Sequence, residues 1–119
     1  MLMENIYWSF GWKQYDSRDE FIRAVQEECD HVSPEGHGWN PQDHVCHGPL
    51  SIEFELMWKD PPDDMIYFEI TTENRPLTQG EILHELNEQS FDFFKDKDHR
   101  FFEGFGDLID GRMYLVTGS

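Results

Sequence analysis

Two runs of alternating apolar residues flank the sequence DPPDD, and this pattern constrains the fold more than any other feature of the chain. Every second residue is apolar in residues 50–58, and the same holds for residues 66–70. Because side chains alternate between the two faces of a strand, each run predicts a β-strand with one buried face. Two prolines followed by aspartates suit neither strand nor helix and therefore predict a turn. We expect an antiparallel hairpin.

The register of this hairpin follows from bringing both apolar faces to the same side of the sheet. Pairing Lys59 with Met65 does this, and it places Glu55 opposite Glu69 on the other face. Because like charges in directly opposite positions destabilise a strand pair, we expect a compensating group. It could be a lysine or arginine from elsewhere, a bound cation, a basic partner surface, or one carboxyl group with a raised pKa. A solvated face with screened charges is the ordinary alternative.

Two helices are predicted by capping boxes that precede apolar residues at helical spacing. The first box pairs Ser17 with Glu20 and the second pairs Thr78 with Glu81. A side-chain oxygen at such a position accepts a hydrogen bond from a backbone N–H that has no partner inside the helix. The first helix should cover residues 18–31, and the second should follow its box.

Further strands are predicted at both ends of the chain. The sequence IYWSFGWK at residues 6–13 alternates strictly, with Ile6, Trp8, Phe10 and Trp12 on one face. Near the C-terminus, Asp-Gly at positions 110 and 111 is a good hairpin turn before a strand at residues 112–117. Residues 101–109 fit either a strand or a loop.

The predicted order is therefore βαββα(β)β in a single α+β domain spanning residues 1–119, with an irregular loop at 33–48. This order favours the split βαβ (ferredoxin-like) topology, in which two helices cover one face of an antiparallel sheet of four or five strands. The alternative keeps the same elements but pairs the C-terminal hairpin as a separate edge.

The chain is strongly acidic, with 25 Asp and Glu against 9 Lys and Arg and a formal net charge of −16. Such a protein repels phosphate backbones, so a nucleic-acid partner is disfavoured, whereas basic protein surfaces are attracted. Solubility alone, with an apolar patch for self-association, is the competing explanation. The first residues lack the basic region and the apolar run of a signal peptide, and no stretch is long and apolar enough for a membrane. We expect a cytoplasmic protein whose two cysteines stay reduced.

A cluster of metal-binding residue types lies between positions 29 and 47. Zinc sites combine about four nitrogen or sulfur ligands, often from two short clusters. Two such clusters occur here, formed by Cys29, His31, His44, Cys46 and His47. Against this interpretation, Cys29 occupies a core-facing helical position, where a free cysteine is usually a small apolar side chain, and the spacing matches no standard zinc motif.

The loop itself has two interpretations that need no metal. It could be a polar connection whose Trp39 packs onto the body of the domain. Long irregular loops in small domains are also often binding loops, so the loop could contact a partner.

Signatures of known enzyme classes are absent from the sequence. We find no G-x-S-x-G, no G-x-x-x-x-G-K, no H-E-x-x-H and no dinucleotide fingerprint. His84, on the polar side of the second predicted helix, and His99 are expected to be solvated.

These observations favour a small acidic, non-enzymatic binding domain that recognises a basic protein, as an inhibitor or immunity protein does, with self-association as the other partner. The alternative is a zinc-binding protein or hydrolase that uses the Cys/His cluster; otherwise no cofactor is expected. The candidate partner-binding residues are Glu53, Glu55, Tyr67, Glu69 and Trp39.

Overall fold

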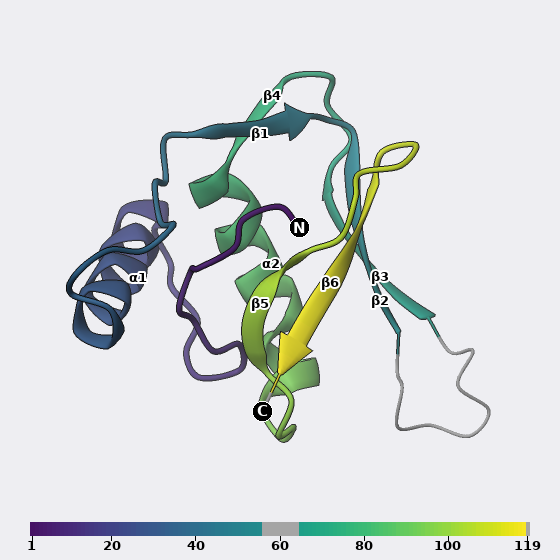
Figure 1. Ribbon diagram of the computed structural model, residues 1–119. Coiled ribbons are helices and arrows are strands. Elements are labelled where there is room, and N and C mark those ends of the chain that lie inside the picture. Colours follow the sequence, from purple (N-terminus) through teal and green to yellow (C-terminus); the bar gives the residue numbers. More distant parts are fainter. Residues whose placement is uncertain (56–64, 119) are drawn as a thin grey trace.

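Two helices and two β-sheets make up the computed structural model, which describes residues 1–55 and 65–118 (Figure 1). In chain order the elements are α1 (Arg18–Val32), β1 (His44–His47), β2 (Leu50–Glu55), β3 (Met65–Thr71), β4 (Pro76–Thr78), α2 (Gln79–Phe94), β5 (Phe101–Phe105) and β6 (Arg112–Gly118). The larger sheet has four strands in the order β3-β2-β6-β5, and the smaller pairs β1 with β4. The predicted α+β class is confirmed.

Both helices begin where the capping boxes predict. The Ser17 hydroxyl accepts a hydrogen bond from the Glu20 backbone N–H at 3.1 Å, and the Thr78 hydroxyl accepts one from the Glu81 N–H at 3.3 Å. In each case a side-chain oxygen satisfies a first-turn N–H that has no carbonyl partner in the helix. The first helix ends at Val32, one residue later than predicted.

The four-stranded sheet is mixed. Strand β2 pairs antiparallel with β3 and parallel with β6, and β5 pairs antiparallel with β6. The split βαβ order is not confirmed, because residues 6–13 do not supply a regular strand of this sheet. Parallel neighbours need a long connection, and here β3, β4, α2 and β5 all lie between β2 and β6 in the chain.

The N-terminal segment, residues 1–12, keeps the predicted alternation without forming the predicted strand. Ile6, Trp8 and Phe10 are buried, as expected, but Trp12 is 73% exposed. The alternation ends because the chain turns at Gly11, whose φ of +76° is a left-handed conformation that favours glycine. A Cβ at this position would lie 2.5 Å from the backbone nitrogen of Lys95, so the turn also fits closely against the end of α2.

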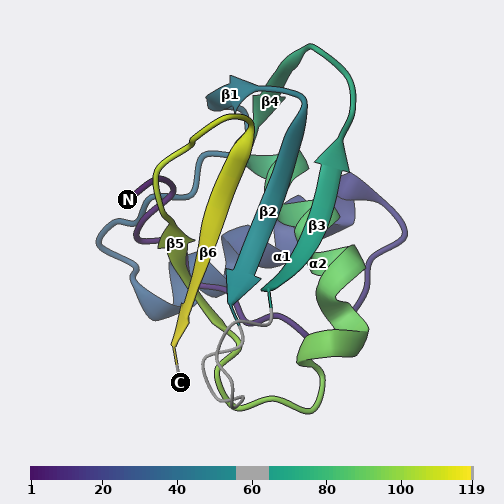
Figure 2. The same ribbon diagram turned by 90° about the vertical axis from the view of Figure 1, so that its right-hand side faces the viewer.

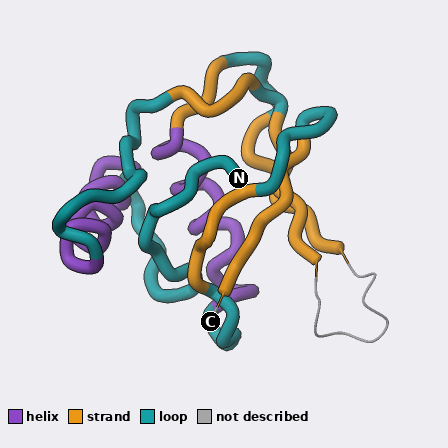
Figure 3. The backbone as a smooth tube through the Cα atoms, viewed as in Figure 1, coloured by secondary structure: helices purple, strands orange, loops and turns teal. Residues whose placement is uncertain are grey.

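This segment runs beside β5, as Figures 1 and 3 show. Leu2 and Phe105 exchange two backbone hydrogen bonds at 2.8 and 2.9 Å, and the Phe102 N–H donates to the Trp8 carbonyl at 2.9 Å. These hydrogen bonds are too far apart along the chain to form a regular β-ladder, but through them the N-terminal segment covers the outer edge of β5.

The helices lie on one side of the four-stranded sheet in two successive layers. Figure 2 shows the sheet in front and both helices behind it, and Figure 1 shows α2 nearer the sheet and α1 on the far side of α2. The apolar face of the sheet packs toward α2, which buries these core residues: Ile52, Phe54, Phe68, Ile70, Met113, Leu115, Leu83, Leu86 and Phe94. Neither α1 nor α2 covers the opposite face of the sheet.

The loop predicted at 33–48 is irregular only in its first part. Residues 44–47 form β1, which pairs with β4 through Cys46 beside Leu77 and His47 beside Pro76. The partner strand has only three residues, too few to show a period of two, so the sequence pattern did not reveal it. In the described ranges 1–55 and 65–118, no helix combines the length and apolar character needed to cross a membrane.

Candidate binding surface

One face of the four-stranded sheet points away from both helices (Figure 2), and its strand positions carry acidic and aromatic residues. We call this surface the acidic sheet face and define it by Glu53, Tyr67, Glu69, Arg112 and Tyr114. Tyr67 is 56% exposed, Glu69 and Arg112 are exposed, and Glu53 and Tyr114 are half-buried. Three of the predicted partner-binding residues, Glu53, Tyr67 and Glu69, therefore share one open surface.

Strand pairing places these residues side by side. Because β2 lies between β3 and β6, Glu53 has Tyr67 as its neighbour on one side and Tyr114 on the other. Side chains at such opposed positions are roughly 5 Å apart at Cβ. The result is a carboxylate set between two phenol rings at the centre of the sheet.

The predicted pairing of Glu55 with Glu69 is wrong. Glu55 pairs with Met65, and Glu69 pairs with Ser51. The register differs from the predicted one by four residues on β2, and because four is even, the same residues stay on the same faces. The predicted turn DPPDD and the pairing of Lys59 lie outside the described residues.

A compensating group was expected for the Glu55–Glu69 pair, which does not form; instead, an arginine of β6 pairs with Glu53. Arg112 Nη1 lies 3.1 Å from Glu53 Oε1, and the Glu53 side chain is only 20% exposed. This arginine is held there because β6 runs parallel to β2, with Ser51 beside Arg112. Sequence analysis missed Arg112 and Tyr114 because the pairing joins strands far apart in the chain.

A shallow pocket of about 440 Å³ lies at the Arg112 end of this face. Its walls are Glu53, Asp107, Ile109, Arg112, Met113 and Tyr114. Ile109 is 65% exposed, although it is a large apolar side chain. Apolar and acidic groups therefore border the same depression, as in the mixed surfaces that proteins use to bind other proteins.

A further carboxylate lies over the last residues of β6. A Cβ on Gly118 would lie 2.5 Å from Glu103 Oε1, so the Glu103 side chain covers this glycine. Gly118 is on the same face of β6 as Arg112 and Tyr114, because their positions differ by even numbers. Glu103 extends the negative charge of the acidic sheet face toward β5.

Trp39 does not belong to this surface. It is only 6% exposed and belongs to the core, where the first interpretation of the loop placed it. The loop is held by His37, whose Nε2 lies 2.9 Å from Asp30 Oδ1 and whose Nδ1 accepts a hydrogen bond from the Trp39 N–H at 3.2 Å. The hydrogen bond from His37 lowers the pKa of the Asp30 carboxyl.

The five candidate metal ligands are spread over different environments. Cys29 is fully buried on α1, His31 is exposed in the last turn of α1, and β1 carries His44 and His47 exposed with Cys46 half-buried between them. Among the described residues, which include all five, no three His, Cys, Asp or Glu side chains are grouped as a metal site requires. The structure does not bring the predicted cluster together.

The thiols are better explained by packing. Burial raises the pKa of Cys29, and burial also raises the pKa of Cys46. A raised pKa keeps a thiol protonated near neutral pH, whereas metal binding and nucleophilic attack need the thiolate. The sulfur of Cys29 accepts a hydrogen bond from the Tyr7 N–H at 3.3 Å and approaches the Tyr7 carbonyl at 3.7 Å, so it fastens the N-terminal segment to α1.

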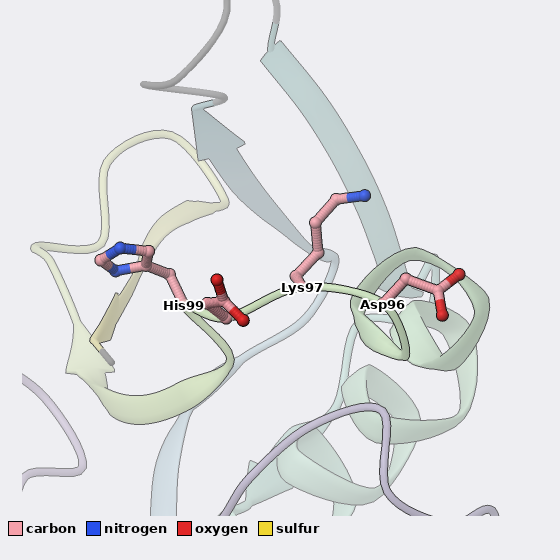
Figure 4. Close-up of a pocket in the computed structure, with 4 residues that line it drawn as sticks. Asp96, Lys97 and His99 are labelled. Atoms are coloured by element: carbon pink, nitrogen blue, oxygen red, sulfur yellow. The ribbon is translucent and has the colours of Figure 1, made fainter.

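A second pocket, of about 310 Å³, lies in the turn after α2 and is lined in the described residues by Asp96, Lys97, Asp98 and His99. Figure 4 shows the side chains of Asp96, Lys97 and His99 pointing in different directions. General acid–base catalysis needs groups that converge on one reacting atom. This arrangement does not supply them.

The expectation that His84 is solvated is wrong. His84 is 8% exposed, its ring centroid lies 5.1 Å from that of Phe21, and its Nε2 lies 3.2 Å from the Tyr15 carbonyl oxygen. That nitrogen must donate, because a carbonyl only accepts. The side chain joins α2 to the chain that enters α1, a structural role that the helical pattern did not reveal.

Comparison of the chain with known protein families, with curated proteins and with solved structures found no match.

Proposed function

We propose that this protein is a small acidic binding domain that recognises a basic protein partner through the acidic sheet face, in the manner of an inhibitor. The observation that carries the proposal is the placement of Glu53, Tyr67 and Glu69 together on a sheet face that neither helix covers. A sheet face with one apolar side packed and one polar side open is ordinary in itself. The exposed aromatic ring among carboxylates is what distinguishes this one.

Charge and aromatic rings would have different roles in such binding. The net charge of −16 would steer a cationic partner and raise the rate of association, an effect that salt screens within about 8 Å at physiological ionic strength. Tyr67 and Tyr114 would supply the contact area, because tyrosine is enriched among the residues that dominate interface energies. Glu53 would exchange its bond to Arg112 for one to the partner.

The buried position of Trp39 favours the sheet face over the 33–48 loop as the contact surface. Nothing in the placement of the five Cys/His residues favours the zinc alternative.

A charge-matched comparison tests the proposal. The tagged protein is used at low salt to capture a basic partner from its source cells, and the affinity of that partner is then measured for two variants. Glu69→Lys changes the acidic sheet face, and Glu27→Lys makes the same charge change at an exposed position of α1, on the far side of the molecule. We expect Glu69→Lys to weaken binding about tenfold or more, and Glu27→Lys to have a much smaller effect.

Tyr67→Ala should weaken binding at both low and high salt, because it removes contact area and no charge. Equal losses for Glu69→Lys and Glu27→Lys would mean that only net charge matters, and the acidic sheet face would have no special role. A captured partner with an acidic surface would contradict the proposal outright.

A further inference from the structure

The two edge strands of the four-stranded sheet, β5 and β3, differ in what pairs with their outer side. The edge at β5 is occupied by the N-terminal segment, through the hydrogen bonds of Leu2 and Trp8. At the other edge, β3 pairs only with β2 in the part of the chain that the structure describes. Natural proteins usually protect such an edge with lysine, proline or a bulge. Strand β3, with the sequence MIYFEIT, has no lysine or proline. Its pairing with β2 shifts register between Leu50 and Ser51, but it is regular over the stretch from Met65 to Glu69.

One contact shows which backbone groups of β3 point away from β2. Gln89 Nε2 of α2 donates a hydrogen bond to the Glu69 carbonyl at 2.6 Å, so this carbonyl points away from β2. In an antiparallel pair the N–H and C=O of one residue point to the same side, and alternate residues point the same way. Met65 and Tyr67 therefore also direct their backbone groups outward, next to the side chains of the acidic sheet face.

A segment that paired with this edge would also lie against the C-terminal half of α2. In Figure 2 the C-terminal half of α2 extends past the edge of β3. Of the four residues three or four positions from Gln89 on this helix, Leu86 is buried in the core, and the others are Glu85, Asp92 and the half-buried Phe93. Glu85 forms an exposed ion pair with Arg18 at 3.9 Å and Asp92 forms one with Lys95 at 3.4 Å, and exposed pairs of this kind are weak.

Charge decides what kind of segment fits. The incoming strand would lie between Glu69 on the sheet and Glu85 and Asp92 on the helix, so it would meet carboxylates on both of its faces. A second copy of the chain would bring another net charge of −16 to this place and another Glu69 to the same edge. Self-pairing is therefore opposed by repulsion, whereas a segment with lysine or arginine side chains is attracted.

We infer that the partner binds partly by adding an extended, cationic segment as a fifth strand beside β3. This inference rests on the proposed function and adds to it the mode of binding. Main-chain hydrogen bonds supply most of the affinity in such strand addition, so a generic extended peptide is a valid probe.

The test uses a short acetylated peptide that alternates lysine with valine, and an analogue N-methylated at two adjacent central residues. The methyl groups block both peptide edges and leave charge and side chains unchanged. Binding to isotope-labelled protein is followed by amide chemical shifts and hydrogen exchange. We expect the unmethylated peptide to bind about tenfold more tightly, because the methyl groups remove main-chain hydrogen bonds. We also expect it to slow hydrogen exchange of the Met65, Tyr67 and Glu69 amides.

Two variants sharpen the result. Gln89→Ala frees the Glu69 carbonyl and should raise affinity for the unmethylated peptide about two- to fivefold while leaving the methylated one unchanged. Gln26→Ala, the same change on α1, should alter neither affinity.

The outcomes separate the two proposals. Equal binding of both peptides, with Glu69→Lys still weakening it, would overturn strand addition and leave the acidic sheet face as a charged contact surface. Selective binding that shifts signals away from β3, or a Gln89→Ala variant that binds the unmethylated peptide no better, would also overturn strand addition. If neither peptide binds at low salt, both proposals are overturned.

Discussion

The two edges of the sheet differ in how their backbone groups are satisfied, although the strands that form them are of similar length. Along β5 the chain supplies its own cover: the N-terminal segment buries Ile6, Trp8 and Phe10 and bonds to the strand. Along β3, within residues 1–55 and 65–118, the cover consists of one side-chain amide, from Gln89. The first edge is therefore part of the core, whereas no strand in these described ranges pairs with the second. Stability and binding should be separable, with mutations at the covered edge affecting folding and mutations at the open edge affecting recognition.

The largest expected effect is at the covered edge. Phe10 is fully buried, and its ring centroid lies 5.4 Å from that of Phe94 and 5.8 Å from that of Phe102. Phe10→Ala should lower the free energy of unfolding by about 3–5 kcal/mol, because it removes buried aromatic area and leaves a cavity. Tyr67→Ala, an aromatic truncation at the open edge, should cost less than about 1 kcal/mol. Urea unfolding monitored by circular dichroism measures both.

Similar costs for the two truncations would remove the distinction between the edges. In that case the N-terminal segment would be a loose addition to the surface of β5.

An intermediate effect is expected from the thiol that fastens the N-terminal segment. Burial raises the pKa of Cys29 in the folded protein, whereas in the unfolded chain the thiol titrates near its ordinary value of 9.0. Above that pH the unfolded state loses the proton first, so stability is complete below about pH 9 and is lost as pH rises through the folded pKa. The slope for one group is at most about 1.4 kcal/mol per pH unit.

The measurement compares wild type with Cys29→Ala in urea melts between pH 7 and pH 10.5. The variant starts from a lower stability because it lacks a buried sulfur, but its stability should decline less steeply above pH 9. Cys46 and Tyr15, whose pKa values burial also raises, contribute equally to both proteins and cancel in the difference. Parallel curves would show that the Cys29 thiol is not coupled to folding.

The local parts of the fold could be predicted from sequence, and the long-range parts could not. Capping boxes at Ser17 and Thr78 placed both helix starts, because a cap depends on residues within one turn. The alternation in residues 6–10 correctly gave the buried side chains but not their backbone pairing. Alternation reports which face is buried, and it does not say which strand lies alongside.

The same limit explains the candidate site. Glu53, Tyr67 and Glu69 were assigned to one face correctly, since an even shift in register leaves faces unchanged. Arg112 and Tyr114 could not be found, because they reach Glu53 through a parallel pairing between residues about 60 positions apart in the chain. The Cys/His cluster wrongly suggested a metal site for a related reason. Cys29 is buried on α1, and closeness in sequence does not place it beside the exposed His44 and His47 of β1.

The smallest effect on stability is expected for Glu69→Lys, and it tests the corrected register directly. If Glu69 were opposite Glu55, charge reversal would relieve repulsion and raise stability; opposite Ser51, it should change the free energy of unfolding by less than about 0.5 kcal/mol. The same substitution is expected to weaken partner binding about tenfold or more. A urea melt and a binding titration on one preparation therefore measure the two properties of the open edge separately. A clear gain in stability would indicate that Glu69 does lie opposite Glu55, as the predicted hairpin register requires. Unchanged stability with lost binding would show that Glu69 contributes to recognition and not to folding.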